Sequence, residues 1–458
     1  GLSESRTVFI EGNDLPRRFA SLQPAQQFVI GETGFGTGLN CLLAADCFLS
    51  HAPPDARLDL FSAELYPLAD RDLRRAHAQP GALSALASAL VRQYPPPVHG
   101  HHLIWLHHRV RLVLMLGEAE GCWSQCPALA DAWFLDGFAP ARNPQMWSQT
   151  LFEALFARSN PGASFATFTA AGQVRRGLAE AGFAVRKIPG FGGKRHRLIG
   201  HKPGTLPVRK IRAGLAVVAG AGLAGCTTAR ALAERGWRVR MIDPSGVASG
   251  ASGNLAGVTH SSVSAHMTAQ NRFYQLALVH ALATFRRMGF PVSDEDGRLD
   301  QVIQYAADAR MARKIDKAYR AGTWPEELLN RRSDRSIAFL GSGFLRPGRW
   351  CRHLLDHPAI DMTTARLLNF TMDKEVLAVT DSTSTYGADV LVLAIAGDIR
   401  QFPVASWLPL KAIRGQVSYV VATPESQRWE QAICHAGYLT PALNGLHCIG
   451  ATFDINET

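Results

Sequence analysis

The sequence predicts two successive α/β domains, the first built on a doubly wound parallel sheet and the second on a Rossmann-like sheet, and three observations support this fold class. Short apolar runs alternate with helical segments, which is the pattern of strand–helix–strand units. This alternation occurs in two separate series, and each series begins with a glycine-rich loop between a strand and a helix. The chain has 458 residues, too many for one ordinary hydrophobic core, so two or three domains are expected.

The first series starts with the short apolar run at residues 27–32. A helical segment follows at 38–49, and a second strand is expected at 57–64. Further strands are expected at residues 131–136, 163–168 and 183–188, with helices around 149–158 and 171–181. Strands that alternate with helices in this way predict a parallel sheet with helices on its faces.

The segment at residues 201–214 separates the two series, because it is rich in Pro, Gly and basic residues and has no apolar period. We expect a first domain at residues 1–204, a linker at 205–213 and a second domain at 214–458. The second series is expected to contain strands at 215–220 and 237–243 around a helix at 223–236, then a helix at 270–288 and strands at 388–397 and 415–421.

The loop of the first series runs from Gly31 to Gly38. Glycine lets the backbone turn sharply and approach a ligand, and the N-terminus of the next helix offers free N–H groups. The next strand ends in Glu64, where a carboxylate commonly accepts from two ribose hydroxyls. An acid followed by G-x-G-x-G is typical of class I S-adenosylmethionine-dependent methyltransferases, and a tight turn without a ligand is the alternative. The candidate cofactor-binding residues are Glu32, Gly34, Gly36, Gly38, Glu64 and Glu118, of which Glu118 is almost equally explained as an acid at a helix N-terminus.

The phrase WFLDGFAPARNP, residues 133–144, places Asp136 at the end of an apolar strand. Ligands of such sheets lie beyond the carboxyl ends of the strands, so Asp136 is expected on the cofactor side. A carboxylate there can accept an N–H bond from an amine, orient it and take its proton. Phe138 is an aromatic neighbour that can stack on a base or stabilise a cation. Asp-Gly is also ordinary turn chemistry, and that alternative stays open.

The loop of the second series reads Gly220-x-Gly222-x-x-Gly225, directly after a strand and at the start of a helix. The following strand ends in Asp243, at about the distance expected for an acid that holds a ribose. The pyrophosphate of a dinucleotide would lie at the helix N-terminus, but NAD and FAD use the same device. The segment GASGN at residues 250–254 is where a flavin-binding chain would pass its cofactor, or a flexible loop.

Charge and cysteine usage restrict the class of protein further. The formal net charge is +10, and residues 186–202 carry six Lys and Arg without an acid, so they form either a polyanion contact or a solvated sheet edge. The eight cysteines form no C-x-x-C pair, which favours buried reduced thiols and a cytoplasmic location. No apolar run is long enough for a transmembrane helix, and no signal peptide opens the chain.

Several phrases together resemble one known family. GETGFGTGLN, DAWFLDGFAPARNPQMW, ATFTAAGQVRRGL and GFGGKRHRL resemble the methyltransferase half of the bifunctional tRNA 5-methylaminomethyl-2-thiouridine biosynthesis proteins, the MnmC family. GAGLAG, GASGN, ADVLVLAIAG, GQVSYV and GYLTP…HCIGA resemble its flavin-dependent half, a domain of the glycine oxidase and D-amino-acid oxidase type. The resemblance covers nearly the whole chain, with both halves in the family order.

The resemblance implies two reactions on the wobble uridine (U34) of tRNA. The flavin half oxidises the C–N bond of a carboxymethylaminomethyl group, and hydrolysis leaves an aminomethyl group, which the other half methylates with S-adenosylmethionine. It implies catalytic roles for Asp136 and Phe138. It assigns Gly34, Gly36, Gly38 and Glu64 to the methyl donor, and Gly220, Gly222, Gly225, Asp243, Ser252, Gly253 and Asn254 to FAD. We further expect tRNA phosphates to contact the basic stretch around Lys194 to Arg197, with no metal and no membrane involved.

Two departures from the family pattern bear on activity. The family has a segment before GLSESRTVFIEGN and continues after HCIGA, so we expect a chain truncated at both ends with an incomplete flavin domain. FAD binding and oxidase activity are therefore left open. The alternatives are a small-molecule amine oxidase fused to an N-methyltransferase without RNA, and a methyltransferase whose oxidase-like half only binds tRNA. The tRNA species and the oligomeric state are not determined by the sequence.

Overall fold

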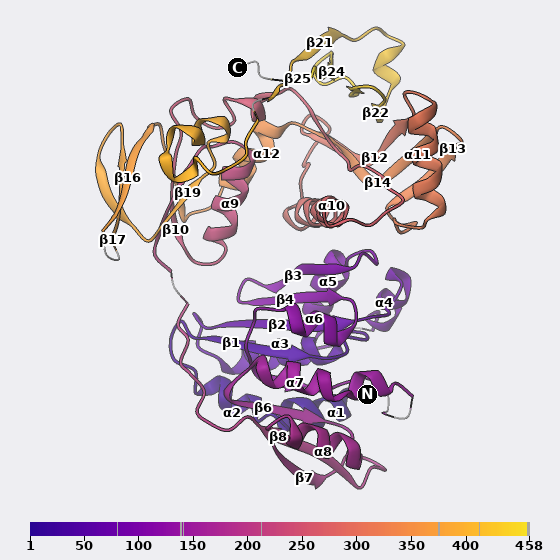
Figure 1. The fold of residues 1–458 in the computed structure, drawn as a ribbon, viewed down its shortest axis with the longest axis vertical. Helices are drawn as coiled ribbons and strands as arrows, with labels where there is room; N and C mark the ends of the chain where they lie inside the picture. Colours follow the sequence, from indigo (N-terminus) through magenta and orange to yellow (C-terminus); the bar gives the residue numbers. More distant parts are fainter. Residues whose placement is uncertain are drawn as a thin grey trace. The chain divides into compact units, whose positions relative to one another are not determined.

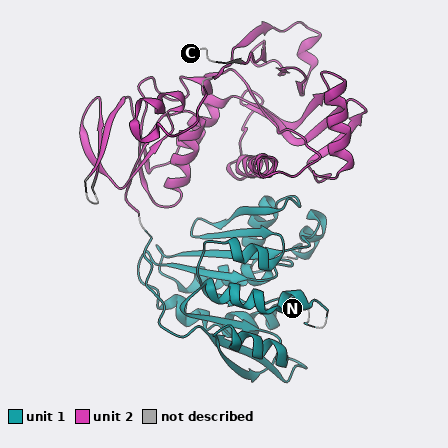
Figure 2. Ribbon diagram, viewed as in Figure 1, with its two compact units in different colours: residues 1–211 teal, residues 212–458 magenta. Residues whose placement is uncertain are grey.

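A computed structural model describes residues 1–79, 81–137, 140, 142–211, 213–373, 376–411 and 413–455. The chain divides into two compact units, Gly1–Ile211 (unit 1) and Arg212–Thr458 (unit 2), shown in different colours in Figure 2. The division falls within residues 205–213, the segment in which we expect a linker.

Unit 1 is built on one mixed sheet with the strand order β3-β4-β2-β1-β5-β6-β8-β7 in the part of the chain that the structure describes (Figure 1). Neighbours from β4 to β6 are parallel, whereas β3 is antiparallel to β4, and β8 lies antiparallel between β6 and β7. The strands are β1 Gln27–Glu32, β2 Arg57–Glu64, β3 Gly100–His107, β4 Val110–Leu116, β5 Ala130–Phe134, β6 Ser159–Thr167, β7 Ala184–Pro189 and β8 His196–His201.

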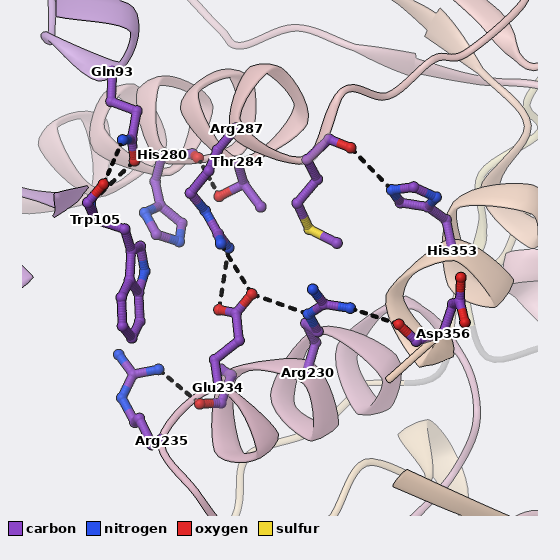
Figure 3. Close-up of polar contacts among 12 residues, drawn as sticks. Gln93, Trp105, Arg230, Glu234, Arg235, His280, Thr284, Arg287, His353 and Asp356 are labelled. Atoms are coloured by element: carbon purple, nitrogen blue, oxygen red, sulfur yellow. Dashed lines mark hydrogen bonds and ion pairs between the residues drawn. The ribbon is translucent and has the colours of Figure 1, made fainter. Parts of the chain in front are cut away.

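Helices cover both faces of this sheet (Figure 1). They are α1 Leu2–Ser5, the π-helix η1 Arg6–Glu11, α2 Leu15–Ala20, α3 Leu39–His51, α4 Asp70–Ala76, α5 Ser84–Gln93, α6 Ala119–Gln125, the 3-10 turn η2 Pro144–Trp147, α7 Gln149–Ala157 and α8 Gly172–Glu180. Gln93 joins α5 to β3 through two hydrogen bonds with the backbone of Trp105 (Figure 3). Its amide nitrogen donates to the Trp105 carbonyl at 2.8 Å, and its amide oxygen accepts from the Trp105 N–H at 3.1 Å.

The central strand β5 is buried on both faces, as parallel strands between helical layers usually are. Phe134 belongs to the hydrophobic core on one side of the sheet, and Trp133 belongs to the core on the other. Both side chains are fully buried, so each contributes about 1.5–3 kcal/mol of hydrophobic stabilisation. This packing fixes the end of β5, and with it the chain that leads to Asp136.

Unit 2 contains a parallel sheet of the expected Rossmann-like type, with the strand order β15-β10-β9-β19 among the described residues. Its strands are β9 Leu215–Ala219, β10 Arg238–Ile242, β15 Ile360–Thr363 and β19 Val390–Leu393. The helices α9 Leu223–Ala233 and α12 Pro347–Leu355 pack against each other beside it (Figure 1). The strand expected at 388–397 is shorter than predicted, because β19 ends at Leu393 and the 3-10 segment η4 Ala396–Gln401 begins three residues later.

A second, largely antiparallel sheet of unit 2 has the order β11-β14-β12-β22-β23-β24-β21 in the described part, with β13 paired to β14. Its strands are β11 Gly257–Thr259, β12 Gly297–Tyr305, β13 Leu329–Ser333, β14 Ser336–Leu345, β21 Val417–Val421, β22 Ala432–Cys434, β23 Tyr438–Leu439 and β24 Leu446–Gly450. The remaining strands of unit 2 are β16 Leu367–Asp373, β17 Val376–Asp381, β18 Thr385–Ala388, β20 Ile413–Arg414 and β25 Asp454–Ile455. The remaining helices are α10 Ala269–Met288 and α11 Ala309–Arg320, and the 3-10 turns are η3 Ala251–Gly253, η5 Pro403–Ala405 and η6 Ser426–Arg428.

Ion pairs join the helices of unit 2 (Figure 3). Glu234, at the end of α9, accepts hydrogen bonds from Arg230 of the same helix and from both terminal nitrogens of Arg287 on α10, at 2.9–3.1 Å. Arg230 also donates to the carbonyl of Asp356, just after α12. Burial alone would raise the pKa of Glu234, but the two arginines hold that pKa below its usual value. The cluster therefore fixes the end of α9 against its neighbours.

The described helices include none that combines the length and apolar character needed to cross a membrane. All eight cysteines are free in the structure, and all but Cys122 are buried.

Candidate functional site

A cavity of about 640 Å³ lies in unit 1 beyond the carboxyl ends of β1, β2 and β5. This is the edge of the sheet at which the sequence places a cofactor. The predicted residues Gly34, Gly36, Glu64, Glu118 and Asp136 all line the cavity, although they come from separate stretches of the chain. Other lining residues include Ser5, Thr33, Phe35, Thr37, Leu39, Asn40, Leu65, Tyr66, Leu68, Gly117, Asn143, Gln145 and Met146.

The glycine loop needs its glycines at two positions for different reasons. Gly38 has a φ of +76° as the N-cap of α3, and a Cβ there would lie 2.5 Å from the ring of Phe35. A Cβ on Gly34 would lie 3.0 Å from the carbonyl oxygen of Asp136, so this position keeps the loop close to the Asp136 segment. Gly34 and Gly36 therefore line one wall of the cavity together with Phe35 and Thr37, whereas Gly38 shapes the loop without lining the cavity.

Glu64, at the end of β2, is held in place by backbone donors. Its Oε2 accepts from the N–H of Gly36 at 2.8 Å, and its Oε1 accepts from the N–H of Tyr66 at 2.9 Å. A carboxylate has about four lone-pair sites, so both oxygens retain capacity for ribose hydroxyls. Glu118 is the N-cap of α6 and lines the same cavity without a side-chain capping bond, so a ligand contact and a helix-dipole role both stay open.

Asp136 lies two residues beyond the end of β5, because this strand ends at Phe134 rather than at Asp136 as expected. Its Oδ1 accepts from the N–H of Gly137 at 2.8 Å, and its Oδ2 accepts from the amide of Asn40 at 2.8 Å. Thr33 donates to its carbonyl oxygen at 2.7 Å. Burial raises the pKa of Asp136 above its usual value, while the bonds from Asn40 and Gly137 oppose that rise.

Glu32 is placed differently from the other predicted residues. Its side chain is buried under the loop and is not among the residues that line the cavity. Its carboxyl accepts hydrogen bonds from Ser62, Asn40 and Cys41. Burial, together with the nearby charge of Asp136, raises the pKa of Glu32 to about 8. A direct contact between Glu32 and a ligand therefore stays a prediction that the geometry does not favour.

The other lining residues were not predicted from the sequence, and two of them form hydrogen bonds with predicted residues. Asn40 and Tyr66 both line the cavity, and neither belongs to the glycine pattern or ends a strand. A usable signal was their position, since Asn40 lies in the first turn after the loop and Tyr66 lies two residues after Glu64. Phe138, the second predicted catalytic residue, lies outside the described residues. Arg142 is exposed, and no role is assigned to it.

The basic stretch at residues 186–202 corrects one prediction. Arg197 is buried and donates to the carbonyls of Val8 and Pro189, so it holds η1 against the sheet and is not available to a phosphate. Lys202 likewise donates to the carbonyls of Phe156 and Ser159. The exposed cations of the stretch are Arg186, Lys187, Lys194 and Arg195, of which Lys194 forms an ion pair with Glu4 at 2.9 Å.

The second glycine loop joins β9 to α9 in unit 2. A Cβ on Gly225 would lie 1.8 Å from the carbonyl oxygen of Gly220, so only glycine allows this contact between helix and loop. Asp243, directly after β10, accepts from the N–H groups of Ala221 and Ser245 at 2.9 Å each. This bare loop at a helix N-terminus, with an acid beside it, fits a dinucleotide such as FAD.

The GASGN segment lies against the start of α9. The hydroxyl of Ser252 accepts from the N–H of Leu223 at 3.0 Å, and a Cβ on Gly222 would lie 3.0 Å from that hydroxyl. Gly253 is in the 3-10 turn η3, and Asn254 follows it with a half-buried side chain. Gly220, Gly222, Gly225, Asp243 and Ser252 are therefore brought together, as the sequence predicts, while their contacts to a cofactor stay a prediction.

Unit 2 contains a cavity of about 440 Å³ that the sequence did not indicate. It is lined by residues around β12, β14, β22 and β23, among them His260, Ser261, Lys314 and His435. Ser261 is buried, and no described residue bonds its hydroxyl. Within the described part of the chain, no group of three or more His, Cys, Asp or Glu side chains could hold a metal ion.

Two family models match the chain. A family of S-adenosyl-L-methionine-dependent methyltransferases matches residues 82–203. A family of FAD-dependent oxidoreductases matches residues 216–458. The two matches fall in unit 1 and unit 2, respectively.

Relatives named as bifunctional proteins match nearly the whole chain. The tRNA 5-methylaminomethyl-2-thiouridine biosynthesis bifunctional protein MnmC of Chromobacterium violaceum is 41% identical, covering 99% of this chain and 73% of that protein. The proteins of the same name from Stutzerimonas stutzeri and Pseudomonas aeruginosa are 40% and 39% identical, and each match covers 100% of this chain and 73% of the relative.

Similar solved structures cover about half of the chain. Glycine oxidase from Geobacillus kaustophilus gives a TM-score of 0.44 at 17% identity, covering 54% of this chain and 72% of that chain. MNMC2 from Aquifex aeolicus gives a TM-score of 0.37 at 21% identity, covering 45% and 63%, respectively.

Proposed function

The chain belongs to the MnmC family of bifunctional tRNA 5-methylaminomethyl-2-thiouridine biosynthesis proteins, and on this premise we propose how its two units share the work. Unit 2 removes the carboxymethyl group from 5-carboxymethylaminomethyl-2-thiouridine by FAD-dependent oxidation. Unit 1 then transfers a methyl group from S-adenosylmethionine to the 5-aminomethyl-2-thiouridine that results. The observation that carries the proposal for unit 1 is the half-buried carboxylate of Asp136, which lines one cavity together with Gly34, Gly36 and Glu64.

In unit 1 the residues divide into a donor side and an acceptor side. Glu64 holds the ribose hydroxyls of the methyl donor, and the bare backbone from Gly34 to Gly38 lies along the donor. S-adenosylmethionine supplies an electrophilic methyl group on sulfur. Asp136 accepts an N–H bond from the substrate amine, directs its lone pair toward that methyl group and takes up the proton that the amine loses. Phe138 stacks on the target base in this proposal.

In unit 2 the loop from Gly220 to Gly225 and the N-terminus of α9 bind the pyrophosphate of FAD. Asp243 is already oriented by two backbone N–H groups and accepts from the adenosine ribose with its remaining lone pairs. Ser252, Gly253 and Asn254 lie along the path of the cofactor. FAD supplies a two-electron acceptor for oxidation of the C–N bond to an imine. Water then hydrolyses this imine, which leaves the aminomethyl group on the uridine.

The substrate of both units is a tRNA, and we propose that the modified position is the wobble uridine at position 34. Exposed cations of the β7–β8 hairpin support contacts with the phosphate backbone, namely Arg186, Lys187, Lys194 and Arg195. Reduced thiols are typical of the cytoplasm, and the free state of all eight cysteines supports activity there.

The test is a reconstitution with tRNA that carries 5-carboxymethylaminomethyl-2-thiouridine. With FAD and S-adenosylmethionine, the full chain should yield 5-methylaminomethyl-2-thiouridine, identified by the mass of the nucleoside after digestion. Without S-adenosylmethionine, the product should stop at 5-aminomethyl-2-thiouridine. Methylation of supplied 5-aminomethyl-2-thiouridine tRNA without any oxidation, by a colourless flavin-free protein, would instead favour a non-catalytic tRNA-binding role for unit 2. Conversion of free amines but not of tRNA would refute the RNA substrate.

A further inference from the structure

We infer that Asn40 is the positioning residue of the methyl-transfer site, and that it holds Asp136 in its working orientation by sharing one amide group between Asp136 and the buried carboxyl of Glu32. The inference rests on the proposed function of unit 1, in which Asp136 receives the substrate amine. It concerns a residue that lies outside the G-x-G-x-G pattern and outside the strand ends, although Asn40 is the last residue of the phrase GETGFGTGLN.

The contacts of Asn40 define this role. Its Nδ2 lies 2.8 Å from Oδ2 of Asp136 and 2.9 Å from Oε1 of Glu32, so the two N–H bonds of one amide serve two carboxyl groups. The residue lies in the first turn of α3, where the glycine loop delivers it to the strand ends. Its side chain is 5% exposed, so water does not replace these bonds freely.

Glu32 is the fixed end of this arrangement. Its other carboxyl oxygen accepts from the hydroxyl of Ser62 at 2.5 Å and from the thiol of Cys41 at 3.2 Å. Three donors from two elements therefore hold Glu32 in place, and Glu32 in turn fixes the amide of Asn40. Asp136 sits on a less regular segment after β5, so its orientation depends on what it contacts.

The bond from Asn40 has an electrostatic consequence as well as a geometric one. Burial favours the neutral form of Asp136, and a neutral carboxyl cannot take up a proton from an amine. A hydrogen bond donated to Oδ2 favours the charged form, which is the form that can take up a proton. The other charges that act on Asp136 are Glu4 on α1, which opposes its ionisation, and Lys194, which favours it. Glu32 lies on the far side of the shared amide.

The remaining atom of the amide also points to a role in the cavity. Asn40 lines the cavity, and no described residue donates to its Oδ1, which is buried. A buried acceptor without a partner is costly, so such atoms commonly bind a ligand or a water molecule. An N–H of the substrate amine is a donor of the right kind for it.

The chain supplies a matched control for the test. Asn160 donates to Oδ1 of Asp131 at 2.7 Å, and Asp131 is a buried aspartate near the start of β5, the strand that leads to the half-buried Asp136. Asn160→Ala removes a similar bond from a similar partner away from the cavity. Asn40→Ala and the milder Asn40→Ser remove or weaken the bond to Asp136, and Asn40→Ser keeps the experiment open if the alanine variant does not fold.

The experiment measures kcat and KM for methyl transfer to 5-aminomethyl-2-thiouridine tRNA from pH 5 to pH 9, with the full chain. Both Asn40 variants should lower kcat at pH 7 by about tenfold or more, and should move the acid limb of the kcat profile to higher pH. Their dissociation constants for S-adenosylmethionine should change much less than kcat. Asn160→Ala should lower the melting temperature without moving the acid limb.

The inference would be overturned if both Asn40 variants fold, keep the kcat of the parent protein and show an acid limb at the same pH as the parent protein. So would the same shift in Asn160→Ala, because it would trace the effect to general loosening of the sheet. Failure of the proposed function looks different, since the parent chain would then transfer no methyl group to this tRNA.

Discussion

Gly225→Ala is the substitution whose effect follows most directly from the coordinates. The added Cβ would lie 1.8 Å from the carbonyl oxygen of Gly220, and ordinary contacts begin at 3.4 Å. Helix α9 and the loop must therefore separate by about 1.6 Å, either by a shift of the helix or by a change in the loop. Overpacking of this kind costs about 1–3 kcal/mol where the surroundings can adapt.

The same separation displaces the helix N-terminus from the place where the pyrophosphate is expected. We predict that Gly225→Ala weakens FAD binding by at least about tenfold, which corresponds to about 1.4 kcal/mol, and lowers the melting temperature of unit 2. FAD binding is measured by the change in flavin fluorescence on titration, and unfolding by circular dichroism. Gly348→Ala on α12 is the control, because its Cβ would meet only ordinary contacts at 3.5 Å or more. Parent-like FAD binding and stability in Gly225→Ala would refute the close-contact reasoning.

Three further predictions concern stability and RNA binding. Unfolded Glu32 loses its proton near pH 4.5, whereas folded Glu32 keeps its proton up to about pH 8. The free energy of unfolding of unit 1 should therefore fall as the pH rises from 4.5 to 8. Urea unfolding of Glu32→Gln should show a smaller fall over this pH range. Glu234→Gln should lower the free energy of unfolding of unit 2 by about 2–3 kcal/mol, because Arg230 and Arg287 lose their anionic partner; an unchanged urea midpoint would contradict it. Lys194→Ala and Arg195→Ala should each reduce the salt dependence of tRNA affinity by about one phosphate contact, whereas Lys202→Ala should not, as fluorescence anisotropy at several salt concentrations would show.

The parts of the site that follow local chain rules could be predicted from the sequence. Glycines between a strand and a helix predict a tight loop that can bind a ligand, because few other residues fit such a turn. The structure agrees at Gly38, whose backbone is left-handed. Glu64 and Asp243 were found because parallel strands present their carboxyl ends at one edge of the sheet. In both cases the signal lies within one strand–loop–helix–strand unit.

The parts that depend on distant contacts could not be predicted. From the sequence, Arg197 was expected to be an exposed cation of the basic stretch. It is buried instead, because the carbonyls of Val8 and Pro189 accept its hydrogen bonds. The strand β8, which contains it, escaped prediction since its polar residues hide the apolar alternation. The role of Asn40 and the cavity of unit 2 depend on contacts between segments that lie far apart in the sequence.

The most direct test of the central claim is the rate of methyl transfer in Asp136→Asn at pH 7, with the dissociation constant for S-adenosylmethionine measured on the same protein. Asparagine preserves the shape of the side chain but cannot take up a proton from the amine. We predict that kcat falls by about 100-fold or more, the range expected for a lost general base, while S-adenosylmethionine binds with nearly parent affinity. A variant that transfers methyl groups to tRNA at the parent rate would contradict the role of Asp136 and, with it, the account of the site.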